Sequence, residues 1–423
     1  MTTLIDPENH FRFRDYQNEI IIKGYKILLE HKLLYLAMEV RTGKTLTSLG
    51  ICNYIFLEKG FNVLFVTKKK AISSIVDDYN LYNPRYNLEV INYESLHKIQ
   101  KNNWDAIICD EAHCMGAFPK PSKRTKQIKE LLQINNPYYI LLSGTPTPES
   151  YSQMYHQVYG HPSSPFSKYK NFYKFASLYI DIKLKYLGGF NTKDYSQGKL
   201  GIIKAMKPYT LSYTQKEAGY KVKTTETFLE IDLKKSTYSL CNLLKKQLVV
   251  QGKKEVILAD TGVKLMSKLH QMYSGTVKFE SGKSMVLDFS KAEYIKSKFK
   301  NKKIGIFYKF TAELKALKET LGDSLTTELD EFNSTNKSIA LQIVSGREGI
   351  SLKKADCLVY YNIDFSATSY WQSRDRMTTK DRLKNNIYWL FSKNGIEKNI
   401  YSAVSKKKDY TLQHFKRDLL TLN

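Results

Sequence analysis

The chain of 423 residues is too long for one ordinary hydrophobic core, so we expect two domains of about 200 residues each. Its 66 lysines and arginines exceed its 41 aspartates and glutamates, and the formal net charge of +25 favours a polyanionic partner, above all nucleic acid. The apolar runs are too short for a membrane span, and the first residues are polar and acidic, unlike a signal peptide.

The cysteines indicate a reducing compartment. There are five, an odd number, and they form no Cys-x-x-Cys pair. Cys52, Cys109 and Cys357 lie within or beside apolar runs, where cysteine usually acts as a small hydrophobic residue. We therefore expect a cytoplasmic protein without disulfides or structural zinc, neither secreted nor bound to a membrane.

The first third of the chain alternates short apolar segments with helical patterns. Strands are predicted at residues 33–37, 63–66, 88–92, 104–109 and 139–143. Helices are predicted at 17–29, 46–57, 72–79 and 125–132. Alternation at this spacing is typical of a parallel, doubly wound α/β sheet.

The rest of the chain predicts a connecting region and a second α/β domain. Residues 149–282 are rich in tyrosine and lysine, and we expect mixed helix and loop there. Beyond them, strands are predicted at 304–308, 339–344, 357–362 and 387–391, with helices at 312–321, 368–376 and 396–404. We expect domains at 1–220 and 221–423, the second including a helical linker to about residue 282.

A phosphate-binding loop is predicted where the first strand gives way to a helix. The segment Met38-Glu-Val-Arg-Thr-Gly-Lys-Thr45 supplies Gly43, Lys44 and Thr45 at the helix start. Backbone N–H groups there can face phosphate oxygens, Lys44 can neutralise the β- and γ-phosphates, and the Thr45 hydroxyl can ligate Mg²⁺. Alone, Gly-Lys-Thr is a weak signal, since a surface turn can have the same sequence.

An acidic motif strengthens that prediction. Asp110-Glu-Ala-His113 directly follows the apolar segment 104–109. A carboxylate at the end of a parallel strand beside the loop is well placed to hold Mg²⁺, and the adjacent Glu111 can orient or deprotonate the attacking water. Together the two motifs predict nucleotide hydrolysis.

Further motifs follow in a characteristic order. They are Phe13-Arg-Asp-Tyr-Gln17, Val63-Leu-Phe-Val-Thr67, Ile91-Asn-Tyr-Glu94, Ser143-Gly-Thr-Pro-Thr147, Pro208 to Lys216, Leu269 to Tyr273, Ile304 to Tyr308, Ser345 to Leu352 and Gln372-Ser-Arg-Asp-Arg376. With the loop and the acidic motif, this set resembles superfamily 2 helicases and translocases, and within them the Swi/Snf-type DNA-dependent ATPases, including small viral members. The resemblance runs from about Phe13 to Glu397 and implies two tandem RecA-like domains with an ATP cleft between them.

In the first domain, the resemblance implies three groups of functional residues. Gln17 would read the adenine edge, since an amide offers both a donor and an acceptor. Contacts with nucleic acid would come from Thr67, Lys68, Asn92 and Tyr93, although the lysines at 68–70 also suit a solvated loop. Coupling between ATP and nucleic acid would involve His113, Ser143 and Thr145.

In the second domain, the resemblance implies nucleic-acid contacts at Ser345 and Gly346, coupling through Gly349, and further contacts from Glu348 and Ser351. Arg376 matches the first arginine of the motif Gln-x-x-Asp/Gly-Arg-x-x-Arg, in which an arginine reaches the γ-phosphate.

The chain departs from this family pattern at several positions. The second arginine of the last motif is replaced by Thr379, so Arg374 or Arg382 would have to substitute for it. Arg41 stands where the phosphate loop of the family usually has glycine. Ser212 and Tyr213 replace two further arginines.

We therefore expect an ATP- and Mg²⁺-dependent translocase acting on double-stranded or branched DNA, in the host cytoplasm if the protein is viral. Two alternatives remain open. One is a helicase that separates strands at forks or in RNA. The other is a nucleic-acid-binding scaffold without ATPase activity, which the substitutions at Arg41 and Thr379 favour. The sequence does not indicate protein partners.

Overall fold

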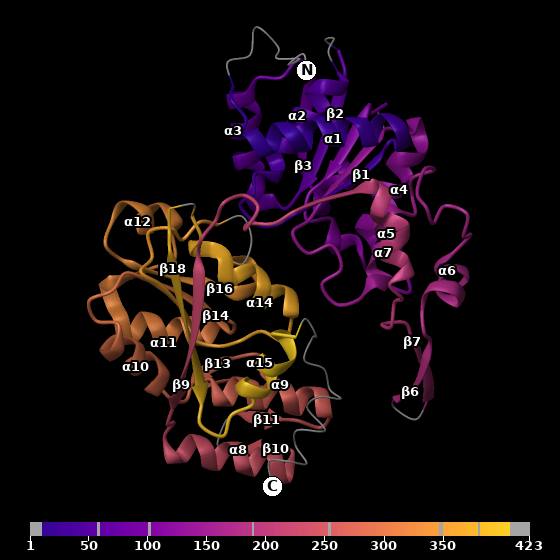
Figure 1. Cartoon of the computed structure of the whole chain (residues 1–423). Helices are drawn as coiled ribbons and strands as arrows, with labels where there is room; N and C mark the ends of the chain where they lie inside the picture. The colour runs from indigo at the N-terminus through magenta and orange to yellow at the C-terminus, as the bar shows by residue number, and fades with distance from the viewer. Residues whose placement is uncertain are drawn as a thin grey trace. The chain divides into compact units, whose positions relative to one another are not determined.

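The computed structural model describes residues 11–56, 60–99, 103–187, 190–252, 255–346, 350–379 and 381–406. The chain divides into two compact units, Met1–Gly219 and Tyr220–Asn423 (Figure 1). Each unit contains a six-stranded sheet in which every pair of neighbouring strands is parallel. The expected fold class is confirmed: two parallel α/β sheets flanked by helices, as in tandem RecA-like domains.

The sheet of the first unit has the strand order β3-β2-β4-β5-β1-β8. Its strands are β1 (Leu33–Met38), β2 (Asn62–Thr67), β3 (Asn87–Asn92), β4 (Ala106–Cys109), β5 (Tyr138–Leu142) and β8 (Thr210–Tyr213). The helices before β5 are α1 (Asp15–His31), α2 (Lys44–Ile55), α3 (Ile72–Tyr82) and α4 (Lys123–Asn135). The strands and helices predicted from the sequence up to β5 are therefore present.

Both faces of this sheet are buried, which explains the continuous apolar runs. In β1, Leu33 and Tyr35 join one hydrophobic core, while Leu34 and Leu36 join the core on the other face. Successive side chains of a strand point to opposite faces, so a strand covered on both sides is apolar throughout. The parallel direction also places the ends of β1, β2, β4 and β5 at one edge of the sheet.

The segment between β5 and β8 completes the first unit. It contains α5 (Met154–Val158), α6 (Phe172–Tyr179), the hairpin of β6 (Lys183–Leu187) and β7 (Phe190–Asp194), and α7 (Gly201–Met206). Tyr155, Phe172 and Phe175 are buried in the same core as one face of the sheet. The chain then returns as β8, which pairs with β1.

The sheet of the second unit has the order β15-β16-β14-β17-β18-β9. Its strands are β9 (Lys223–Ile231), β14 (Ile304–Tyr308), β15 (Leu325–Thr326), β16 (Ser338–Gln342), β17 (Cys357–Tyr360) and β18 (Lys384–Ser392). Around it lie α8 (Lys235–Gln247), α9 (Gly262–Tyr273), α10 (Ser290–Lys298), α11 (Thr311–Leu321), α12 (Leu329–Ser334), α13 (Ile343–Gly346), α14 (Ala367–Arg374) and α15 (Glu397–Val404).

Several details differ from the sequence prediction, and three of them concern the second unit. The region expected to be a helical linker contains α8 and α9, but also β9 and two hairpins, β10 (Val249–Gln251) with β11 (Val256–Leu258) and β12 (Thr276–Lys278) with β13 (Ser284–Val286). The strand predicted at 339–344 ends at Gln342 and continues as α13. The helix predicted at 368–376 ends at Arg374, and one 3₁₀ turn follows.

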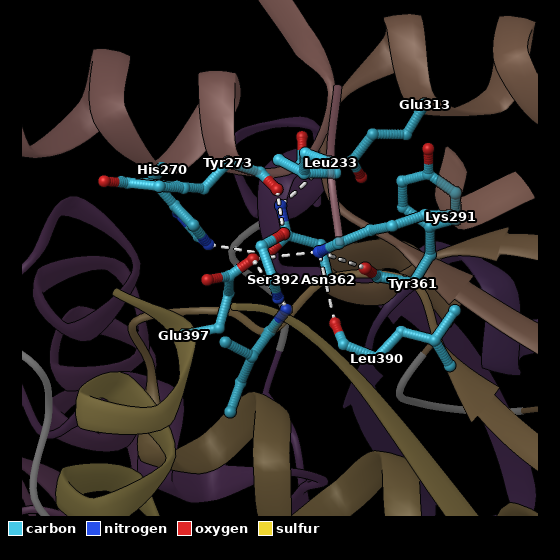
Figure 2. A network of polar contacts seen from close by, with 12 residues as sticks. Leu233, His270, Tyr273, Lys291, Glu313, Tyr361, Asn362, Leu390, Ser392 and Glu397 are labelled. Carbon is cyan, nitrogen blue, oxygen red and sulfur yellow. Dashed lines mark hydrogen bonds and ion pairs between the residues drawn. The ribbon is translucent and has the colours of Figure 1, made fainter. Parts of the chain in front are cut away.

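A buried polar network joins several elements of the second unit (Figure 2). Lys291 and Glu397 are fully buried and form an ion pair of 2.8 Å. The Lys291 ammonium also donates to the carbonyl oxygens of Tyr361 and Leu390. This one side chain therefore ties α10 to α15 and to the ends of β17 and β18.

No helix in the described part of the chain combines the length and the apolar character needed to cross a membrane.

Candidate active site

The phosphate loop connects β1 to α2 through two residues with left-handed backbone. Gly43 has φ 78°, a left-handed conformation that favours glycine, and a Cβ added there would lie 2.5 Å from Nε2 of Gln17. Both the backbone conformation and the lack of room for a side chain therefore require glycine. Arg41 has φ 66°, which costs a non-glycine residue roughly 1–2 kcal/mol. The loop therefore adopts a left-handed conformation at Arg41 despite the substitution noted in the sequence.

Lys44 begins α2 with its ammonium folded over the loop. Its Nζ donates to the carbonyl oxygens of Met38 (3.0 Å) and Glu39 (3.3 Å). Thr45 follows in the first helical turn, where backbone N–H groups lack partners within the helix. Cation, hydroxyl and helix N-terminus thus lie together, a combination that suits a phosphate group.

Aromatic and amide side chains from distant segments support the loop. The hydroxyl of Tyr16 donates to the Thr42 carbonyl (3.1 Å), and the Tyr16 ring stacks on Tyr213 at 4.7 Å. The Gln215 backbone N–H donates to Oε2 of Glu39 (2.7 Å). Tyr213 occupies one of the two arginine positions of the family pattern and here supports the loop through Tyr16. Both residues lie within motifs quoted from the sequence, but the sequence did not indicate these contacts, because their partners Thr42 and Glu39 are distant in the chain.

Gln17 contacts the loop directly. Its side chain is 4% exposed, and its Oε1 accepts from the Arg14 backbone N–H at 3.1 Å. Its Nε2 donates to the Gly43 carbonyl and the Thr47 hydroxyl, both at 3.3 Å. The amide thus holds the start of α1 and the phosphate loop together, while its adenine-reading role stays a prediction.

Asp110 is held at the end of β4 from two sides. Its Oδ2 accepts from the Thr67 hydroxyl (2.9 Å), and its carbonyl accepts from the Tyr93 hydroxyl (2.7 Å). Burial, followed by the charge of Glu111, raises the pKa of Asp110 to about 6, although the Lys44 ammonium opposes the rise. A cation beside this carboxylate would favour its charged form.

Residues suitable for Mg²⁺ are present near the loop. The Thr45 hydroxyl and the Asp110 carboxylate are hard oxygen ligands of the kind that Mg²⁺ prefers. Asp110 and Glu111 are adjacent, half-buried carboxylates, and the charge of Glu111 raises the pKa of Asp110, so a divalent cation would offset their repulsion. The donor set therefore fits Mg²⁺ bound together with phosphate oxygens.

A chain of polar contacts leads from Glu111 across the sheet edge. Glu111 has φ 49°, and its Oε2 lies 3.2 Å from Nδ1 of His113. The same Nδ1 lies 3.0 Å from the Ser143 hydroxyl, whose oxygen accepts from the Thr145 backbone N–H at 3.1 Å. The structure brings together the three residues of the first unit that were predicted to couple ATP with nucleic acid, His113, Ser143 and Thr145, and the coupling itself stays a prediction.

Comparison with known proteins places the chain in a family. The profile of the SNF2-related domain matches residues 10–277, more than half of the sequence. The chain belongs to the SNF2-related domain family. A search of curated proteins found no match. Among solved structures, the chain is similar to the SWI2/SNF2 ATPase core of Sulfolobus solfataricus in complex with dsDNA, with 15% identity, a TM-score of 0.42, and coverage of 99% of this chain and 96% of that one.

The nucleic-acid residues predicted in the first unit of this SNF2-related chain lie in different settings. Thr67 and Tyr93 are buried, and their hydroxyls contact Asp110. The Asn92 side chain caps a 3₁₀ helix by accepting from the Ser95 backbone N–H at 2.8 Å. Lys68 is partly exposed. The geometry gives Thr67 and Tyr93 a role in positioning Asp110, and all four nucleic-acid contacts stay predictions.

Two nucleic-acid residues predicted in the second unit belong to α13. Ser345 is exposed, and its hydroxyl donates to the Gln342 carbonyl at 3.3 Å. Gly346 is buried, and a Cβ added there would lie 2.8 Å from Cβ of Leu341. Close packing is thus one reason for glycine at this position. The predicted Glu348 and Gly349 lie outside the described residues.

The three candidate arginines of the SNF2-related chain make different contacts. Arg374 forms an ion pair of 2.7 Å with Glu226 and lies over the rings of Tyr370 and Trp371. Arg382 donates to the carbonyl oxygens of Lys353, Asp356 and Lys384. Arg376 is 6% exposed, and its Nε donates to the Gln372 carbonyl at 2.9 Å.

Glu226 was missed by the sequence analysis. It lies on the edge strand β9, and its carboxylate also accepts from the Trp389 indole N–H at 2.8 Å and the Tyr401 hydroxyl at 3.0 Å. These partners are distant in the chain, so no local pattern indicates the contact. Glu226 anchors α14 through Arg374.

Proposed function

We propose that this SNF2-related chain is an ATP-dependent DNA translocase, which hydrolyses ATP to move along or remodel duplex DNA. The observation that carries the proposal is the convergence of the phosphate loop, Asp110 and the contact between Glu111 and His113 at one edge of the first sheet. Membership of a family of nucleic-acid-dependent ATPases supports ATPase activity. We also propose that the chain is a small viral, DEAH-containing member of superfamily 2.

The residues of the phosphate loop have distinct proposed roles. Lys44 already directs its ammonium over the loop, and we assign it to the β- and γ-phosphates. Gly43 permits the close approach of a phosphate to the backbone. Gln17 keeps the loop in place and is proposed to bind adenine as well.

Asp110 and Thr45 are proposed to hold Mg²⁺, which would neutralise charge that develops on the phosphates. Thr67 and Tyr93 fix the orientation of Asp110 through its carboxylate and its carbonyl. Glu111 is proposed to orient the attacking water or accept its proton. His113 lies within contact of both Glu111 and Ser143, which supports its proposed role in signalling between the nucleotide and the nucleic acid.

Arg376 is the proposed γ-phosphate arginine. It matches the first arginine of the family motif, whereas Arg374 is held by an ion pair with Glu226 and Arg382 lies beyond the motif. Arg376 itself donates to the carbonyl oxygens of Gln372 and Ile350. Removal of an arginine that contacts the γ-phosphate in the transition state costs roughly 10³–10⁵-fold in rate. We therefore expect a larger rate loss from Arg376→Ala than from Arg382→Ala.

The domain assignment and the DNA partner complete the proposal. We assign residues 1–220 to an ATP-binding domain and 221–423 to a C-terminal helicase domain. The charge of +25 supports electrostatic binding to the DNA backbone. Thr67, Lys68, Asn92, Tyr93, Ser345 and Gly346 remain the proposed contacts, with Thr145 and Gly349 in coupling.

The experiment that tests the proposal is steady-state phosphate release. It is measured without nucleic acid and with duplex DNA, single-stranded DNA, forked DNA and RNA, for the wild type, Lys44→Ala and Glu111→Gln. We expect strong stimulation by duplex DNA that both variants lose. Stimulation mainly by forks or RNA would favour a strand-separating helicase, and no hydrolysis with any substrate would favour a scaffold.

A further inference from the structure

A hollow of about 620 Å³ opens at the amino-terminal edge of the second sheet. It is formed by the end of α10, the chain that leads into β14 at Ile304, the start of β16 at Ser338, and the residues before β17. Ligand sites in proteins usually measure 300–1,000 Å³, so the hollow is large enough for a small organic molecule. The proposed ATPase residues do not line it.

Positive charge dominates this hollow. Five lysines line it: Lys296, Lys300, Lys302, Lys303 and Lys354. Its lining also includes Asp356, whose Oδ2 already accepts from the Lys303 backbone N–H at 2.8 Å. Positive charge gathered in a concave site raises the local concentration of anions.

Two of the lysines are fixed in position. The Lys303 ammonium donates to the carbonyl oxygens of Phe332 and Thr335, and the Lys354 ammonium donates to that of Asn333. Burial, and then the charge of Lys354, lower the pKa of Lys303. The two ammonium groups therefore repel each other, and a bound anion would reduce that repulsion.

The other three lysines project into solvent at the rim. Lys296, Lys300 and Lys302 are exposed, and none of them forms an ion pair with another described residue. Lys296 and Lys300 also line an adjoining hollow of about 810 Å³, which contains Glu293 and Glu319. Glu293 and Glu319 thus lie in the adjoining hollow, and the first hollow, with five lysines and Asp356, is the more cationic.

Polar side chains complete the lining of the hollow. Ser324, Asn336 and Ser338 belong to it together with Leu321, whereas the lining residues Ile295, Phe299 and Ile304 are buried in the core of the second unit, at 0%, 5% and 2% exposed. The accessible groups of the hollow are therefore mainly ammonium groups and hydrogen-bonding side chains, which suit phosphate oxygens.

We propose that this hollow is a second anion site, which binds a multiply phosphorylated ligand with its phosphates at the lysines. The shared chemistry is a run of phosphate groups, supplied either by a free nucleotide-like molecule or by a nucleic-acid backbone. The proposal does not depend on ATP hydrolysis by the first unit, so either proposal can fail while the other holds.

Calorimetric titration with inorganic tripolyphosphate tests the site. The full chain carries Lys44→Ala, which removes the phosphate-loop cation, and EDTA excludes Mg²⁺. The pocket variant adds Lys300→Ala with Lys302→Ala. The matched control instead adds Lys298→Ala with Lys318→Ala, two exposed lysines of α10 and α11 that do not line the hollow.

We expect saturable binding that the pocket variant weakens by roughly tenfold or more and the control changes by less than about twofold. Equal weakening in both variants, or no saturable binding to the parent chain, would overturn the proposal. Equal thermal midpoints for the two variants verify that both are folded. The titration of the parent chain with tripolyphosphate is repeated in the presence of a short single-stranded oligonucleotide. If the oligonucleotide blocks tripolyphosphate binding, the ligand is a nucleic-acid backbone, and if tripolyphosphate binds as before, the ligand is a free phosphate compound.

Discussion

The buried lysine in Figure 2 gives the sharpest test of the packing of the second unit. In Lys291→Met, Glu397 loses its 2.8 Å partner, and the carbonyl oxygens of Leu390 and Tyr361 lose donors at 3.1 and 3.3 Å. Both charged side chains are fully buried, so the carboxylate cannot regain water without local opening. Removing one partner of a buried pair costs roughly 3–5 kcal/mol.

The double variant Lys291→Met with Glu397→Gln separates lost packing from uncompensated charge. It removes both charges and keeps similar volumes, so we expect it to recover at least about 2 kcal/mol of the loss. Lys398→Met is a matched control, because its pair with Glu230 is exposed and measures 3.8 Å. We expect that control to cost less than about 1 kcal/mol.

Urea unfolding followed by tryptophan fluorescence measures these differences, since Trp389 lies in the core of the second unit. With a slope of roughly 2 kcal/mol per molar urea, the single variant lowers the unfolding midpoint by about 1.5–2.5 M. A single variant that loses less than about 1 kcal/mol would refute this reasoning. So would a double variant no more stable than the single one.

Three further changes have defined outcomes. Gly43→Ala places a Cβ 2.5 Å from Nε2 of Gln17 in a backbone with φ 78°, so the phosphate loop must shift. We expect the nucleotide affinity measured in a binding titration to fall by roughly tenfold or more, and an unchanged affinity would contradict the loop geometry described above. Thr67→Val removes the hydroxyl that donates to Asp110, so we expect half-maximal ATP hydrolysis to need a Mg²⁺ concentration roughly 10–100-fold higher. An unchanged Mg²⁺ requirement would show that Thr67 does not position Asp110 and would leave only its predicted contact with nucleic acid. Burial lowers the pKa of His161 from 6.5 to about 4, so unfolding takes up a proton below pH 6.5 and stability falls as the pH drops toward 4. Between pH 7 and 4.5 the wild type should lose about 2 kcal/mol more than His161→Gln in urea unfolding, and equal losses would exclude this histidine as the cause.

The strands that are buried on both faces could be predicted from the sequence, and the more exposed edge strands could not. β1, β2 and β4 are covered on both faces, so their apolar runs were visible in the sequence. β8 and β9 are edge strands with many polar or partly exposed side chains, and their patterns resemble loops. Pairing with a neighbouring strand, rather than local composition, makes them strands.

Site residues that belong to contiguous motifs could be predicted from the sequence, whereas contacts between residues far apart in the chain could not. Lys44 and Asp110 belong to contiguous motifs, so their types and spacing carried the signal. Tyr16, Gln215 and Glu226 act through partners far away in sequence. Those contacts exist only once the sheets have formed, so a single sequence could not reveal them.

Displacement of a third strand from a DNA triplex measures the central claim most directly, because it reports movement along a duplex that remains paired. We predict ATP-dependent displacement by the wild type and none by Lys44→Ala, with the underlying duplex intact. Separation of the duplex strands in place of triplex displacement would contradict the translocase account in favour of a helicase. ATP hydrolysis without displacement of either kind would contradict coupling to movement.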